Sequence, residues 1–199
     1  MRIKETGPGV YSTNGSPADC VYLGIQVILN RKPDLIISGI NTGPNMGRDV
    51  NYSGTVAAAK EGAFLGVPSI AVSICARQDF RFQDAARITH NIIDSIGGKP
   101  FLKDTFLNVN IPNTPLERSK GFMVTRLGKR IYNEKILERI DPRGGKYYWI
   151  GGNAEDYEHI RGTDFYAIEK GYISITPLSL DMTDTGSMKN YRAYFRNGL

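Results

Sequence analysis

Residues 34–59, DLIISGINTGPNMGRDVNYSGTVAAA, decide the fold because a short apolar run, a loop rich in Gly and Asn, and an Ala-rich segment follow one another. The run DLIISGI, bounded by Pro33 and Gly39, shows no alternation of apolar and polar residues, which is typical of a strand covered on both faces. Ser53 suits the cap of a helix in SGTVAAAKEGAFLG, and Gly66 follows its end. The next run, VPSIAVSI, has the pattern of another buried strand, so the order strand, helix, strand predicts parallel pairing.

The neighbouring segments extend this pattern. Residues 16–30 predict a helix capped by Ser16, and residues 82–96 predict a further helix. Residues 105–112, TFLNVNIP, predict a third core strand, so the fold class is three-layer α/β with a mainly parallel sheet. Six side chains of the helix at 82–96 are expected to face the core: Phe82, Ala85, Ala86, Ile92, Ile93 and Ile96.

The two ends of the chain depart from a complete doubly wound domain. The N-terminal residues are polar and lead straight into a helix, so the first strand–helix unit is expected to be missing. Between residues 120 and 180 strand-like pieces take over, namely FMVTRLG, KYYWIG, FYAIEKG and YISITPL, with a hairpin turn at Asp141-Pro142-Arg143-Gly144-Gly145. We expect a partial α/β core over 1–122, a β-rich extension with a return strand to the core over 123–180, and an arm over 181–199 with a short helix.

Composition excludes several classes of protein. Hydrophobic residues make up 41% and charged residues 23% of the 199 residues, values that exclude intrinsic disorder and fibrous repeats. No apolar run approaches the roughly 18 residues of a spanning helix, and no secretion signal opens the sequence, so we expect a cytoplasmic protein without a membrane partner. The net charge of +5 is scattered, which disfavours a nucleic-acid partner and is typical of an ordinary solvated surface. The alternative is a field that attracts an anionic small substrate or a polyanion. Cys20 and Cys75 are expected to be plain buried thiols.

Two motifs in the opening stretch carry candidate chemistry. Gly39-Ile40-Asn41-Thr42-Gly43 has the spacing of a nucleophile elbow, with an amide in place of the nucleophile. The Asn41 oxygen suits Mg²⁺ or Mn²⁺, and its amide suits a phosphoryl oxygen; the alternative is a Gly-rich turn. At Ser53-Gly54-Thr55 small residues start a helix, whose N-terminus favours a phosphate; the alternative is an ordinary cap.

Other catalytic schemes find no support in the sequence. His90 and His159 stand outside any zinc-binding spacing. The chain also contains neither a Walker A motif nor G-x-G-x-x-G, the usual signatures of nucleoside triphosphate and dinucleotide binding.

Seven stretches together have a family resemblance: GSPADCV (15–21), PDLIISGINTGPNMG (33–47), YSGTVAAA (52–59), DPRG (141–144), YWIG (148–151), GTDF (162–165) and GYISITPL (171–178). They span almost the whole chain in family order. The sequence resembles the SurE family, survival-protein 5'-nucleotidases that remove phosphate from nucleoside monophosphates with a divalent metal.

The resemblance implies an α/β core with a Rossmann-like sheet, a β-hairpin extension and a C-terminal arm, the last two used in homodimers or homotetramers. It implies a metal held by two adjacent aspartates after the first strand, a serine in a following loop, and the asparagine that corresponds to Asn41. It also implies that Asn45, Ser53, Gly54 and Thr55 line the phosphate pocket.

The family's paired aspartates have no counterpart in this sequence, where they would precede Met1. One neutral amide cannot replace them, because a tightly held divalent ion needs carboxylates and about six ligands. We therefore expect no catalytic residue within the chain and no activity from it alone; if it were active, Asp49 is the nearest other carboxylate. Two functions stay open: a metal-dependent 5'-nucleotidase, or a non-catalytic oligomerising remnant of one.

Overall fold

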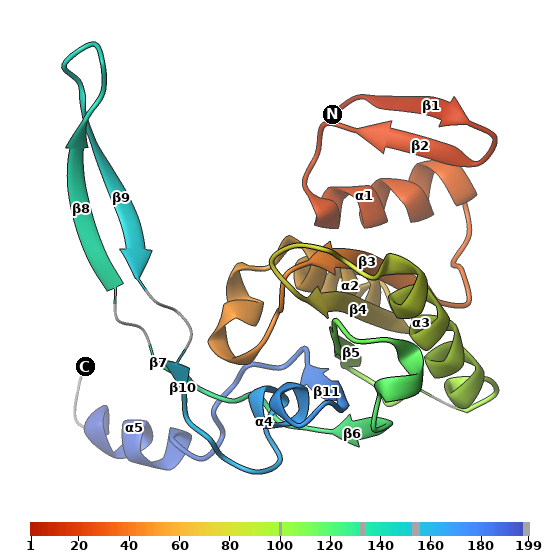
Figure 1. The fold of residues 1–199 in the computed structure, drawn as a ribbon. Helices are drawn as coiled ribbons and strands as arrows, with labels where there is room; N and C mark the ends of the chain where they lie inside the picture. Colours follow the sequence, from red (N-terminus) through yellow and green to blue (C-terminus); the bar gives the residue numbers. More distant parts are fainter. Residues whose placement is uncertain (100, 132–133, 153–155, 197–199) are drawn as a thin grey trace.

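The fold is centred on a five-stranded mixed sheet with strand order β3-β4-β5-β11-β6 (Figure 1). The computed structural model describes residues 1–99, 101–131, 134–152 and 156–196. Strands β3, β4 and β5 are parallel, and β11 runs antiparallel to β5 and parallel to β6. The prediction of an α/β fold with a mainly parallel sheet is confirmed. The strand bounds are Ile36–Thr42 (β3), Ser69–Cys75 (β4), Thr105–Pro112 (β5), Phe122–Val124 (β6) and Ile173–Ser179 (β11).

Two helices cover opposite faces of this sheet. Helix α2 (Gly54–Phe64) is capped by Ser53, whose hydroxyl accepts a hydrogen bond from Val56 N at 3.1 Å, as expected. Helix α3 (Phe82–Ile96) has the predicted bounds. Its inward face differs, because Phe82 and Ala86 are exposed while Ile88 and Thr89 are buried.

The two faces of the sheet differ in chemistry. One face packs against α3 through an apolar cluster that includes Ile70, Val72 and Ile74 of β4. Side chains alternate along a strand, so the intervening residues point to the other face, on the side of α2. There, deeply buried polar residues stand among the apolar ones. We call the following set the polar sheet face: Ser73, Asn108, Asn110, Ser174 and Thr176.

Strand β3 corrects the expectation of a strand covered on both faces. Within the described residues it pairs with β4 alone and forms one edge of the sheet. None of its residues is fully buried, and Ile37 is 40% exposed. A continuous apolar run therefore does not by itself show that both faces of a strand are covered.

The N-terminal region contains two strands before its first helix, contrary to the expectation of a polar segment that leads straight into a helix. Strands β1 (Ile3–Gly7) and β2 (Val10–Thr13) form an antiparallel hairpin beside α1 (Pro17–Leu23), as Figure 1 shows. Ser16 and Asp19 form a capping box at the start of α1, which continues as a π-helix over Gly24–Leu29. The predicted helix at 16–30 is thus confirmed in extent, with a wider second half.

A long hairpin projects from the core in Figure 1, formed by β8 (Glu134–Ile140) and β9 (Lys146–Gly152). Its base is a short antiparallel pair, β7 (Arg130–Ile131) with β10 (Asp156–Tyr157). Helix α5 (Met188–Tyr194) forms in the C-terminal segment, as expected. Two 3-10 turns complete the elements, η2 (Gly47–Tyr52) and η3 (Leu116–Arg118).

The piece FYAIEKG was expected to be a strand and is instead helix α4 (Asp164–Glu169). Thr163 caps this helix by accepting from Tyr166 N at 3.3 Å, and Asp164 supplies an acidic first turn. A favourable cap and packing against β11 thus outweigh the aromatic and β-branched composition.

The helices and the two cysteines test the expectations about a membrane and about buried thiols. None of their helices combines the length and apolarity needed to cross a bilayer. Cys75 is partly buried and free, whereas the free Cys20 is exposed, so the expectation of two buried thiols is wrong for Cys20.

Candidate functional site

The candidate site lies where β3 ends and α2 begins. Asn41 is the penultimate residue of β3, and its Nδ2 donates to Gly43 O at 2.9 Å. This bond uses one of the two Nδ2 hydrogens, and the Oδ1 atom is left to accept from or bind another partner. In open α/β sheets ligands bind at the carboxyl ends of the strands, which is the position of Asn41.

The first turn of α2 forms the second part of the site. The Ser53 hydroxyl is engaged as the helix cap, so the ordinary-cap alternative applies to its side chain. A Cβ at Gly54 would lie 2.9 Å from Pro17 Cγ, which shows how closely α1 approaches this turn. The first N–H groups of a helix have no partner within it, so those of Gly54 and Thr55 suit an anion.

The loop between these parts, residues 43–53, lies over the polar sheet face. Asn45 is 7% exposed, and its backbone N donates to Asn110 Oδ1 at 2.9 Å. Its backbone O accepts from Asn108 Nδ2 at 2.8 Å and Asn110 Nδ2 at 2.9 Å. Its own Nδ2 donates to Ser73 Oγ at 2.6 Å. Asn45 thus holds the loop down, and its contact with phosphate stays a prediction.

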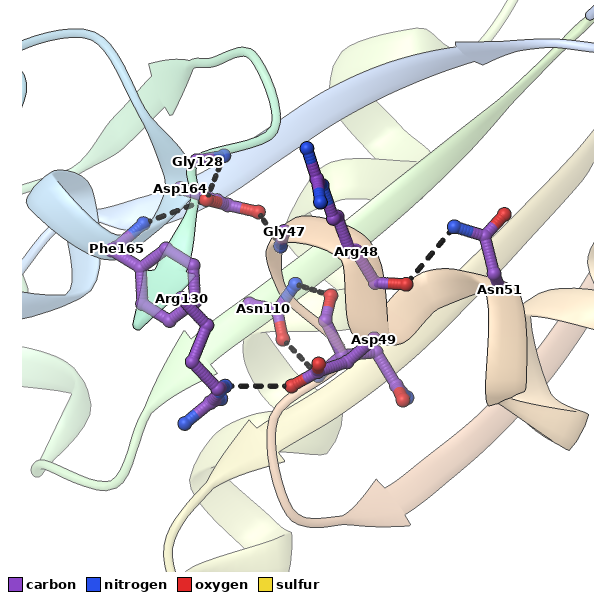
Figure 2. A network of polar contacts seen from close by, with 10 residues as sticks. Gly47, Arg48, Asp49, Asn51, Asn110, Gly128, Arg130, Asp164 and Phe165 are labelled. Atoms are coloured by element: carbon purple, nitrogen blue, oxygen red, sulfur yellow. Dashed lines mark hydrogen bonds and ion pairs between the residues drawn. The ribbon is translucent and has the colours of Figure 1, made fainter. Parts of the chain in front are cut away.

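Two residues beyond Asn45, the loop is held by a buried carboxyl group. Asp164 Oδ2 accepts from Gly47 N at 2.7 Å, and Oδ1 accepts from Gly128 N at 2.8 Å and Phe165 N at 2.9 Å (Figure 2). Burial raises the pKa of the Asp164 carboxyl above its ordinary value, and the three N–H donors oppose that rise. The sequence singled out Asp164 only as part of GTDF and did not indicate this contact.

Asp49 is engaged as well. Its Oδ2 forms an ion pair with Arg130 Nε at 2.9 Å, and the Arg130 guanidinium lies over the Phe165 ring at 5.2 Å from its centroid (Figure 2). A carboxylate paired with arginine is a poor metal ligand. Asp49 is therefore a weak substitute for the aspartates of the family.

The described residues do not make up the ligand set of a divalent metal by themselves. They contain no group of three or more His, Cys, Asp or Glu side chains that could hold an ion. His90 pairs with Asp94 and His159 with Glu169, both as surface contacts. Asn41 offers one neutral oxygen, which is far short of the roughly six ligands expected.

Comparison with known proteins identifies the group to which this strand–loop–helix unit belongs. A sequence profile described as "Survival protein SurE" matches residues 1–134. The chain belongs to the SurE family. It is 46% identical over 190 residues to a Pelobacter propionicus protein named "5'-nucleotidase SurE" and 47% identical over 194 residues to an Aquifex aeolicus protein of the same name. These alignments cover 95% and 96% of the chain, and 77% of each relative.

The fold agrees with the SurE assignment. The chain superposes on a structure titled "Crystal Structure of Sure Protein from Aquifex aeolicus" with a TM-score of 0.86 at 44% identity. This match covers 97% of the chain and 79% of the Aquifex chain. The Rossmann-like α/β core that the resemblance implied is thereby confirmed.

Proposed function

We propose that this chain forms the phosphate-binding side of a SurE 5'-nucleotidase site, at which water and a nucleoside monophosphate give a nucleoside and inorganic phosphate. The observation that carries the proposal is the 46–47% identity, over at least 95% of the chain, to relatives that are named 5'-nucleotidases. The net charge of +5 supports an anionic substrate, because a positive field speeds its approach.

In this proposal Asn41 contributes one oxygen to a Mg²⁺ or Mn²⁺ ion. Ser53, Gly54 and Thr55 line the phosphate pocket at the positive end of α2, where the N–H groups of Gly54 and Thr55 are open. Asn45 supports the loop beside them. A divalent ion in such a site polarises a phosphoryl oxygen and activates water. The described residues lack the other ligands that such an ion needs, so the 199 residues alone are proposed to be inactive.

We also propose that the chain assembles as a homodimer or homotetramer in the cytoplasm, through its hairpin and C-terminal arm. Large aromatic side chains on both are exposed, including Trp149 at 61% and Tyr194 at 75%. Large apolar groups left in water favour an interface. The division into residues 1–122, 123–180 and 181–199 belongs to this proposal. A non-catalytic oligomerising role is the second candidate, and the same exposed side chains favour it.

The first test is phosphate release from AMP with Mg²⁺ or Mn²⁺, with and without a chelator. The 199-residue polypeptide is expected to release phosphate at the background rate. The same polypeptide preceded by a strand–helix segment with the family's paired aspartates is expected to show chelator-sensitive release. Background release from the extended protein would favour the non-catalytic alternative.

The role of Asn41 is tested in the extended protein. Asn41→Ala is expected to weaken Mn²⁺ binding by at least about 10- to 100-fold, the loss already caused by changing residues that only support metal ligands. Asn91→Ala, which changes an exposed asparagine on α3, is the matched control and should bind Mn²⁺ as the parent does. Equal Mn²⁺ affinity in both variants would remove Asn41 from the metal site.

A further inference from the structure

Asp164 connects three segments that are distant in the sequence. Its side chain is fully buried, and its two oxygens accept backbone N–H groups of Gly47, Gly128 and Phe165. Gly47 belongs to the loop between Asn41 and Ser53, Gly128 precedes the base of the projecting hairpin, and Phe165 lies in α4. In Figure 2 the carboxyl group stands between these three segments.

Close packing at Gly47 shows that the loop is fitted to this anchor. Gly47 has φ +55°, and a Cβ there would lie 2.8 Å from Gly128 O and 2.9 Å from Phe165 Cε2. Both neighbours are residues whose N–H groups bind the same carboxyl. The loop backbone therefore sits directly against the segments that Asp164 holds.

The loop has two further points of attachment on either side of Gly47. Asn108 and Asn110 hold the backbone of Asn45, and Arg130 holds the Asp49 carboxylate. Asp164 differs from these two attachments because its single buried carboxyl group accepts from the loop and also from the segments at Gly128 and Phe165 that the loop packs against. Its loss leaves buried N–H groups unsatisfied on both sides at once.

We propose, on the basis of the function proposed above, that Asp164 is a positioning residue for nucleotide phosphate. It holds the residue 43–53 loop so that Asn41 at one end and Ser53–Thr55 at the other face the same phosphate. A site binds well only when its groups are already in place, because ordering a loop on binding costs conformational entropy.

The variant that tests this is Asp164→Asn, which keeps the shape but places an NH₂ group against a backbone N–H. The matched control is Thr125→Val, another buried and nearly isosteric change. Thr125 Oγ1 bonds Ser174 Oγ and Thr176 Oγ1, and none of these bonds reaches the loop. Hydrogen–deuterium exchange at low micromolar concentration would follow residues 43–53 and, as the internal reference, β4 and β5.

In Asp164→Asn, hydrogen exchange in residues 43–53 is expected to become about 10-fold faster while β4 and β5 stay protected. The affinity for AMP, measured by ligand-observed NMR with Mg²⁺, is expected to weaken about 10-fold. Thr125→Val should lower the melting temperature without either change. The same exchange and binding in both variants would overturn the proposal.

Two more results separate the possible failures. If Asp164→Asn does not fold, hydrogen exchange in the parent protein tests the proposal. The backbone N–H groups of Gly47 and Gly128 should be protected to a similar degree, and free exchange at Gly47 would overturn the proposal. If the parent protein does not bind AMP, the phosphate assignment fails, and the exchange comparison alone decides whether Asp164 holds the loop.

Discussion

At the residue scale, Glu169 shows how a cluster of contacts tunes one exposed carboxylate. It accepts hydrogen bonds from Lys170 Nζ at 2.7 Å, His159 Nδ1 at 3.1 Å and the Tyr157 hydroxyl at 3.1 Å. The bond from Lys170, followed by those from His159 and Tyr157, lowers the pKa of Glu169 from 4.5 to about 2. The cluster ties the end of α4 to β10 and to the segment after it.

This shift predicts a pH dependence of stability. A lowered folded-state pKa stabilises the protein above pH 4.5, and the stabilisation is lost as the pH falls toward about 2. Between these values the melting temperature should fall more steeply for the parent than for Glu169→Gln, and the two should run parallel below pH 2. Lys170→Met removes the strongest partner of Glu169, so its melting temperature should depend on pH less steeply than that of the parent and more steeply than that of Glu169→Gln. If the melting temperatures of the parent and of Glu169→Gln fell in parallel from pH 5 to 2, the lowered pKa of Glu169 would be contradicted.

At the element scale, α2 lies close to the sheet because its inward residues are small. Val56, Ala58, Ala59 and Gly62 are its buried residues. A Cβ at Gly62 would collide with Ser69 Oγ and lie 2.7 Å from Ile36 Cδ1. Gly62 therefore sets the distance between α2 and strands β3 and β4, and with it the position of Ser53 relative to Asn41.

Gly62→Ala is predicted to lower the free energy of unfolding by about 1–3 kcal/mol, the usual effect of overpacking. Gly24→Ala is the control, because Gly24 has helical φ −57° and ψ −45° and nothing lies within 4 Å of a Cβ there. That change should be neutral or stabilising by up to about 1 kcal/mol. Urea unfolding measures both, and equal midpoints would show that α2 does not need the close approach.

At the scale of the whole molecule, apolar groups remain exposed at several places. The β8–β9 hairpin and α5 carry the aromatic residues Tyr147, Tyr148, Trp149, Tyr191, Tyr194 and Phe195, between 44% and 75% exposed. The edge of β3 adds backbone groups that no described strand pairs. Both features favour association, the first through apolar burial and the second through strand pairing.

Light scattering at tens of micromolar is expected to give at least a dimer, with some tendency to aggregate. Trp149→Asp should lower the average mass, because it places a charge where an apolar contact is proposed. Leu102→Asp, at a residue 74% exposed outside these surfaces, should leave the mass unchanged. A stable monomer of the parent protein would exclude the proposed assembly.

The sequence by itself determined the features that short stretches encode. The helix at 82–96 and the Ser53 cap formed at the predicted residues, because helical periodicity and capping depend on residues within about four positions of one another. The strand at 105–112 also has the predicted bounds. Asn41 and Ser53 could also be picked out, since both belong to one strand–loop–helix unit with recognisable spacing.

Tertiary structure decided which residues support that unit. Asn45 meets Asn110 across 65 positions, Asp49 meets Arg130 across 81, and Gly47 meets Asp164 across 117. It also left the faces of β3 partly exposed and let a capped helix form at FYAIEKG. Such contacts arise only when packing brings distant segments together, because a buried donor or acceptor takes whichever partner the fold places beside it.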